Sequence, residues 1–356
     1  MNGSVIGSWQ VTQRDLGGKI LEKTETLGGT TVTHAYTYDG NGRLTSVKRN
    51  GTLTEEYRYD AFPFGNCSYR TSSLRGATSE IPTYDADDRM TGIADRTYSY
   101  DDDGRLTQKV RGYVEQTLYH YSSRGELLNV TLPEGDVIEY VNDPLGRRVA
   151  KKINGTTLEK YLWQGQTRLL AVYDDSDTLL MRFRYADGRM PVSMTKNGQT
   201  YYLVWDQAGS LKAVADSAGT VVKTVTFDSF GYIVSDSNPS FDVPFGFAGG
   251  LHDVDTGLVR FGARDYDPEI GRWTAKDPIL FAGGDTDLYG YVLNDPVNFV
   301  DPWGLWKVTV GGSGFAHDVS SVLYDSSAGW FPSTKQILVF PPRYSEVEFN
   351  LFLILR

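Results

Sequence analysis

The chain has 356 residues and a formal charge of −10, and its 40% of apolar residues are enough to form a folded core. This acidic balance argues against the whole chain being a nucleic-acid binder, because such proteins usually present a basic face. Cys67 is the only cysteine, which excludes an intrachain disulfide and a cysteine-based zinc site. The four histidines are scattered without ligand spacing, so we expect neither a metal ion nor a cofactor.

The amino-terminal residues MNGSVIGSWQ have neither a basic start nor an apolar run, so they do not form a secretory signal peptide. No segment reaches the ~18 apolar residues that a membrane span requires. We therefore expect a protein that is cytoplasmic when made. If it is exported, it should reach the cell surface or the medium without a signal peptide.

One short sequence recurs along the chain from residue 36 onward. YTYDGNGRLTSV (36–47) returns as YSYDDDGRLTQKV (98–110), and weaker copies are found elsewhere. The residue that follows the second aromatic sets the register, and it recurs at a mean interval of 21 residues. The register positions are 39, 60, 85, 101, 122, 143, 164, 186, 206 and 228.

Each repeat predicts a β-hairpin. Tyr36 and Tyr38 are two residues apart, which puts both rings on one face of a strand. The following Asp39-x-x-Gly42 is typical of a type I turn with a left-handed glycine. Because one hairpin is marginal in water, the hairpins should pair with their neighbours in a winding antiparallel sheet, which gives an all-β fold. The recurring tyrosines are then expected to form a packing ladder along this sheet rather than a ligand platform.

The motif YxYDxxGRLT, nearly complete at 36–45 and 98–107, resembles the Rhs/YD-repeat family of bacteria. The resemblance covers about residues 30–305. It implies a spiral of hairpins wound into a hollow β-cocoon that encloses a carboxy-terminal toxin, with residues 1–240 as part of this shell. The family's shells use more repeats than the ten counted here, so an open, curved sheet is the alternative.

Residues 241–305 break the 21-residue rhythm and resemble the Rhs repeat-associated core. They contain GLVRFGARDYDPEIGRW, LYGYVLNDPVN and DPWGL in the family's order. In the family this core is an intramolecular aspartyl protease that cuts after the leucine of Asp-Pro-x-Gly-Leu. The resemblance therefore implies cleavage of this chain between Leu305 and Trp306.

Two carboxylates of this core, Asp265 and Asp277, are the candidate catalytic pair. Peptide hydrolysis needs one group to take a proton from water and another to protonate the departing amine, and two neighbouring carboxylates that share a proton can do both. Arg264 would stabilise the charge that develops. By residue type alone these aspartates are equally ordinary turn formers, and Asp267 is an alternative to Asp265.

Residues 306–356 lack the repeat, and the family has a variable toxin at this position. The 51 residues include one His-Asp pair but no recognisable nuclease constellation, so nucleic acid is only one class of target for such a tip. A compact toxin and a truncated remnant both fit this length. The resemblance also implies a delivery apparatus, an immunity protein and a role in competition between bacteria. Two alternatives stay open, namely a non-catalytic surface scaffold that binds glycans or proteins and a decayed Rhs fragment.

Overall fold

The computed structural model describes residues 4–60, 65–186, 188–310, 319–325 and 329–333. In these residues the chain is built from antiparallel strands and four short 3-10 helices, and α-helix is absent. The all-β fold predicted from the repeat is therefore confirmed. No helix in this part of the protein is long and apolar enough to cross a membrane.

Two long sheets contain most of the strands. The 9-stranded sheet consists of β1 (Ser4–Arg14), β2 (Ile20–Leu27), β3 (Thr30–Tyr38), β4 (Leu44–Arg49), β5 (Thr52–Tyr59), β6 (Cys67–Ser72), β7 (Ala77–Glu80), β30 (Val319–Asp325) and β31 (Gly329–Ser333). Its order is β31-β30-β1 followed by β2 to β7, and the 3-10 helix η1 (Ser73–Arg75) precedes its last strand.

The 16-stranded sheet continues the array, and each strand pairs with its sequence neighbours. It consists of β8 (Thr83–Tyr84), β9 (Met90–Ile93), β10 (Arg96–Tyr100), β11 (Leu106–Arg111), β12 (Glu115–Tyr121), β13 (Leu127–Thr131), β14 (Val137–Asn142), β15 (Arg148–Ile153), β16 (Thr156–Gln164), β17 (Arg168–Tyr173), β18 (Leu179–Tyr185), β19 (Pro191–Lys196), β20 (Gln199–Trp205), β21 (Leu211–Asp216), β22 (Val221–Phe227) and β23 (Ile233–Asp236).

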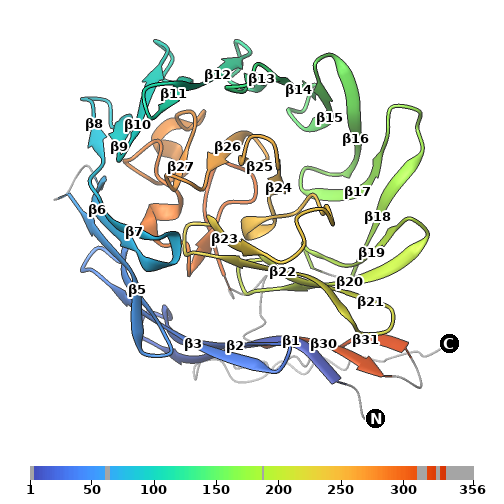
Figure 1. The fold of residues 1–356 in the computed structure, drawn as a ribbon. Helices are drawn as coiled ribbons and strands as arrows, with labels where there is room; N and C mark the ends of the chain where they lie inside the picture. The colour runs from blue at the N-terminus through green and yellow to red at the C-terminus, as the bar shows by residue number, and fades with distance from the viewer. Residues whose placement is uncertain (1–3, 61–64, 187, 311–318, 326–328, 334–356) are drawn as a thin grey trace.

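The strands of both sheets follow a ring, and the segment after β23 lies inside it (Figure 1). This interior segment consists of η2 (Phe247–Gly249), β24 (Leu251–His252), β25 (Val259–Phe261), β26 (Arg264–Asp267), β27 (Arg272–Trp273), η3 (Leu280–Gly283), η4 (Val292–Asn294), β28 (Phe299–Val300) and β29 (Val308–Thr309). Its aromatic centre includes Phe261, Tyr266 and Trp273, each at most 2% exposed.

The hairpin turns have the chemistry that the repeat predicts. Asp39 Oδ1 accepts the backbone N–H groups of Asn41 and Arg43, both at 2.9 Å. Gly42 has φ +81°, so the predicted left-handed glycine is confirmed. The aspartate thus satisfies two backbone donors of a tight turn without help from distant residues.

A feature that the repeat did not predict is a register shift at its second aromatic. The pairing of β3 with β4 slips between Thr37 and Tyr38, and that of β5 with β6 slips between Arg58 and Tyr59. Such a bulge bends the strand and increases its twist. Repeated at the same end of successive hairpins, it curves the array into a ring. Equivalent shifts occur at Tyr100, Tyr121, Trp163, Tyr185 and Trp205.

The repeated aromatics are part of the packing. The first aromatic of a repeat is buried, as at Tyr36, Tyr57, Tyr98 and Tyr119. The second donates its hydroxyl hydrogen to the preceding hairpin, with Tyr38 bound to the Ile20 carbonyl and Tyr59 to that of Leu44, both at 2.7 Å. Arg43 lies 4.7 Å from the centre of the Tyr59 ring. Equivalent tyrosines are therefore linked from hairpin to hairpin through a hydroxyl and an arginine.

Buried ion pairs attach the interior segment to the ring. Lys151 Nζ of β15 lies 2.8 Å from Asp253 Oδ1, and Arg96 Nη1 of β10 lies 2.7 Å from Glu269 Oε1. Apolar contacts accompany them, since Leu258 packs in the cluster of ring tyrosines that includes Tyr98. The interior segment is therefore held in a defined position against several arcs of the ring.

Candidate functional site

The DPWGL segment at the end of the predicted core forms a turn that shares two contacts with the repeat turns. Asp301 Oδ1 accepts the N–H of Leu305 at 3.1 Å, as Asp39 does for the residue four positions later. Gly304 has φ +64°, and its N–H lies 3.4 Å from the Asp301 carbonyl oxygen. The predicted cleavage bond, Leu305–Trp306, therefore leaves the turn directly at its last residue.

This turn is docked on the tight connection between β25 and β26. The N–H of Ala263 donates to the Trp303 carbonyl at 2.8 Å, and Arg264 Nε donates to the Gly304 carbonyl at 2.7 Å. A Cβ on Gly262 would lie 2.3 Å from the Trp303 carbonyl oxygen, which is too close for a carbon and an oxygen that are not bonded. The glycine therefore lets two backbones approach closely enough to fix the segment before the bond.

Asp277 lies beside the predicted cleavage bond. Arg264 Nη2 is 2.9 Å from Asp277 Oδ2 and 3.4 Å from Asp301 Oδ2, so one nitrogen bridges two carboxylates. A Cβ on Gly283 would lie 2.7 Å from Asp277 Oδ2 and also 2.7 Å from the Leu305 carbonyl oxygen. Asp277 Oδ2 and the Leu305 carbonyl oxygen are therefore at most twice this distance apart.

The surroundings of Asp277 favour its uptake of a proton. Its side chain is buried, with 6% of the residue exposed. The N–H of Ile279 holds Oδ1 at 2.9 Å, which leaves Oδ2 to face Arg264 and the cleavage segment. Burial raises the pKa of Asp277, and the guanidinium of Arg264 offsets only part of this rise. Asp277 is thus a stronger base than an exposed aspartate.

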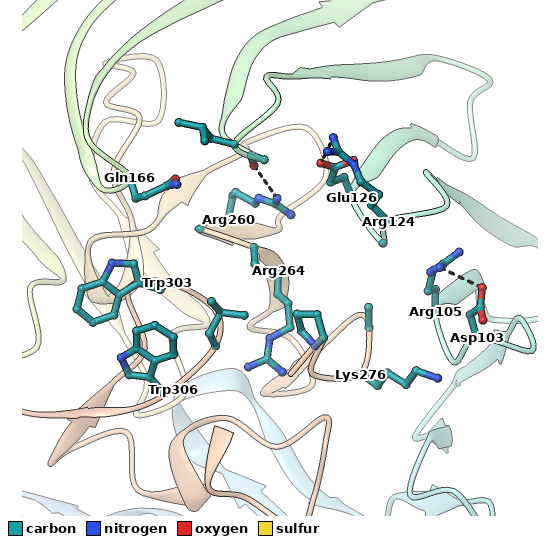
Figure 2. A pocket seen from close by; sticks show the side chains of 18 residues that line it. Asp103, Arg105, Arg124, Glu126, Gln166, Arg260, Arg264, Lys276, Trp303 and Trp306 are labelled. Carbon is teal, nitrogen blue, oxygen red and sulfur yellow. Dashed lines mark hydrogen bonds and ion pairs between the residues drawn. The ribbon is translucent and has the colours of Figure 1, made fainter. Parts of the chain in front are cut away.

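A cavity of about 600 Å³ opens at the bond (Figure 2). Leu305 and Trp306 both line it, and the Trp306 ring stacks on Trp303 with 5.5 Å between centroids. Trp306 is 44% exposed. The two residues of the bond are therefore both accessible from the cavity.

The structure separates Asp265 from Asp277. Neighbouring residues of a strand point to opposite faces, so Asp265 points away from the side on which Arg264 meets Asp277. Arg148 Nη2 binds Asp265 Oδ1 at 2.9 Å, and Arg260 Nη1 binds Oδ2 at 2.8 Å. Both oxygens are thus engaged by guanidinium groups between the ring and the interior segment. Direct participation of Asp265 in proton transfer stays a prediction.

Two residues at this site, Asp301 and Gly283, are not among the site residues predicted from the sequence. Asp301 had a readable signal, because Asp301-x-x-Gly304 repeats the spacing of the hairpin turns and Asp143-Pro-Leu-Gly146 is nearly identical to it. Gly283 had none, since its importance comes from two atoms that the fold brings to it from other segments.

Replacing Gly283 by alanine should slow cleavage at Leu305–Trp306. Its backbone is not left-handed, so the added methyl acts by its volume alone and must push Asp277 away from the Leu305 carbonyl. A misplacement of about 1 Å at a reacting centre can cost ~100-fold in rate. The matched control is Gly284→Ala, which strains a backbone with φ +82° but whose new methyl has Lys307 Nζ, at 4.0 Å, as its nearest contact. Equal cleavage rates in the two variants would contradict the geometry.

Residues 3–297 match the family described as Teneurin YD-shell. The chain belongs to the teneurin YD-shell family. Teneurin-3 of Danio rerio is 32% identical to this YD-shell chain over 327 residues, which cover 85% of the chain and 12% of that protein. This match confirms the resemblance to YD-repeat proteins that the repeat motif indicated.

A bacterial relative is also similar to this YD-shell. The tRNA3(Ser)-specific nuclease WapA of Bacillus spizizenii is 28% identical over 285 residues, covering 78% of this chain and 12% of the nuclease. The chain thus spans about an eighth of the length of these curated relatives. The crystal structure of TcdB2-TccC3-Cdc42 aligns with a TM-score of 0.44 and 19% identity over 82% of this chain and 20% of that one.

Proposed function

We propose that this YD-shell chain is a component of an Rhs-type toxin that releases residues 306–356 by hydrolysing its own Leu305–Trp306 bond. The observation that carries the proposal is the convergence of the Asp277 carboxylate and the Leu305 carbonyl at Gly283. Two further features support it. The segment before the bond is fixed by backbone contacts, and the bond borders a cavity large enough for water.

In this reaction Asp277 acts as the base. Ionised Asp277 accepts a proton from the water molecule that attacks the Leu305 carbonyl carbon, and general base catalysis of this kind contributes about 10²–10⁴-fold to rate. Arg264 keeps the carboxylate in place and binds the Gly304 carbonyl next to the bond. Because the substrate is part of the same chain, no entropy is lost in collecting it.

The parts of the chain have separate roles in this proposal. Residues 1–240 form the shell, residues 241–305 form the cleaving core, and residues 306–356 are the released tip. The proposed setting is competition between bacteria, with export from the cytoplasm by a delivery apparatus and an immunity protein that protects the producer. A tip that acts on nucleic acid is one option, and the tRNA nuclease among the relatives supports it.

A time course of newly made protein tests the proposal. All five methionines precede Trp306, so methionine-labelled chain from cell-free synthesis reports both the whole protein and the shell piece. We expect the whole chain to convert to the shell piece at a rate that does not change on dilution, since the reaction is intramolecular. A rate that falls on dilution would contradict self-cleavage.

The alternative is a non-catalytic scaffold that binds glycans or proteins. Membership of the teneurin YD-shell family fits this function equally well. A scaffold would stay whole throughout the time course. An intact chain in which Asp277 and Arg264 can be replaced without loss of partner binding would favour it.

Cleavage should slow in acid at a higher pH than expected for an ordinary aspartate. The base works only when ionised, so the rate falls as the pH drops through the pKa of Asp277, and burial raises that pKa. The rate is measured after dilution of labelled chain into buffers of different pH. A rate that stays constant down to about pH 4, where exposed aspartates titrate, would contradict the assignment of Asp277.

A further inference from the structure

The turn before the cleavage bond lacks a side-chain contact that the repeat turns ending in arginine have. In the repeat turn at Asp143, the N–H groups of Leu145 and Arg147 bind Oδ1 at 2.9 and 3.0 Å. The Arg147 side chain then returns its Nε to Asp143 Oδ2 at 2.7 Å. At Asp301 the equivalent of this arginine is Leu305, so the turn supplies no guanidinium of its own to the second oxygen.

This exchange changes which form of the aspartate is favoured. At Asp143, burial acts to raise the pKa, but hydrogen bonds from Arg147 lower the pKa of Asp143 below the ordinary value. At Asp301 burial dominates and raises the pKa, while Arg264 and backbone N–H groups offset only part of the effect. Two turns of similar sequence therefore hold carboxyl groups of opposite character. Asp301 retains a proton under conditions in which Asp143 does not.

Asp301 also lies at the atom that must gain a proton when the bond breaks. Its carboxyl group accepts the N–H of Leu305 at 3.1 Å, and the backbone N–H of Trp306 lies near enough to lower its pKa. The Trp306 nitrogen is the leaving group of the proposed hydrolysis. Arg264 Nη2, which contacts both Asp301 and Asp277, keeps the two carboxyl groups on the same side of the segment.

We propose that Asp301 is the general acid of the cleavage site, in which a repeat turn has been converted into a proton donor. This inference rests on the proposed self-cleavage and adds to it the group that protonates the leaving nitrogen. Asp277 takes one proton of water while the water oxygen bonds to the Leu305 carbon. The carbon–nitrogen bond then breaks, its electron pair stays on the Trp306 nitrogen, and that nitrogen takes the proton of Asp301.

The products balance without any other reactant. Leu305 ends in a carboxyl group, Trp306 begins with an amine, Asp277 holds the proton from water and Asp301 is left ionised. The turn also explains the choice of bond, because its carboxyl group binds the N–H of Leu305 and lies near that of Trp306. The proton donor is thus built into the segment that is cut.

The test replaces the same aspartate in two turns. Asparagine still accepts the turn's N–H groups through its side-chain oxygen, so Asp301→Asn keeps the turn but loses the transferable proton. We expect the cleavage of Asp301→Asn to be slower by about 100-fold or more. The matched control is Asp143→Asn, which makes the same change in the repeat turn and should be cut at the wild-type rate. Melting temperatures of both variants are measured beside the labelled time course.

The outcomes separate this inference from the proposed function. If wild type and Asp301→Asn are cut equally fast at Leu305–Trp306, Asp301 is not the acid, although self-cleavage stands. If wild type is not cut, the proposed function itself fails. A structural role alone would lower the melting temperature of Asp301→Asn without the specific loss of rate.

A second variant covers the case in which Asp301→Asn does not fold. Asp301→Glu keeps a transferable proton, so it should be cut more slowly than wild type. The fall in rate at high pH, where the acid ionises, should move to a different pH. A folded Asp301→Glu with the rate and the pH dependence of wild type would overturn the inference.

Discussion

Asp277→Asn is expected to leave the chain whole. An amide can neither accept the proton of the attacking water nor carry a charge beside Arg264, so the rate should fall by about 100-fold or more. The exchange is nearly isosteric, and the N–H of Ile279 can still bind the side-chain oxygen that replaces Oδ1. The measurement is a denaturing gel of wild type and variant after equal times, together with their melting curves. The control Asp102→Asn changes an exposed aspartate and should be cut like wild type.

The melting curve matters because Asp265→Asn is expected to behave differently. Asp265 is 2% exposed and neutralises two buried guanidinium groups, those of Arg148 and Arg260. Removing one partner of a buried ion pair typically costs about 3–5 kcal/mol. Loss of cleavage in Asp265→Asn would therefore come with a loss of stability, whereas Asp277→Asn should destabilise the chain less, because Arg264 keeps Asp301 as a partner. An Asp277→Asn chain cut at the wild-type rate would refute the base.

Tyr57→Ala is expected to reduce the free energy of unfolding by about 3–5 kcal/mol, as for other large buried rings. The Tyr57 ring is 5% exposed and packs edge-on against Phe230 of the turn between β22 and β23, with 5.0 Å between centroids. Its hydroxyl donates to Glu55 Oε2 at 2.6 Å. Truncation would thus leave a cavity between the two sheets of the ring and deprive the buried Glu55 carboxylate of one of its donors.

The matched control for this ring is Tyr113→Ala. Tyr113 is 94% exposed at a hairpin turn, so the same change should alter the free energy of unfolding very little. Denaturant unfolding followed by tryptophan fluorescence measures both variants. Equal, small effects would mean that the repeated aromatics are solvated and dispensable, which would favour a surface role for them over the packing ladder.

The hairpins were predictable because their chemistry is local. In each turn the aspartate accepts backbone N–H groups within five residues, and the glycine adopts the left-handed conformation, as Asp39 and Gly42 do. The period and the strand pairing can therefore be read from the sequence. The curvature was not predictable in the same way. The curvature comes from register shifts such as that at Tyr38. No residue type in the repeat signals that the strand pairing shifts there.

The cleavage site was predictable only in part for a related reason. The resemblance pointed to Arg264, Asp277 and the bond after Leu305, which the fold brings together. It could not reveal that Asp265 faces Arg148, because that contact joins residues 117 positions apart and depends on which arc of the ring the core meets. Successive side chains of a strand point to opposite faces, so Asp265 and its neighbour Arg264 face different sides.

The most direct test of the account is the mass of each polypeptide in the purified protein after complete denaturation, together with the amino-terminal residue of the smaller one. Self-cleavage predicts two species in place of the 39.7 kDa chain, one ending at Leu305 and one of 51 residues beginning at Trp306. A single species of 39.7 kDa, or a small fragment that begins at another residue, would contradict the account.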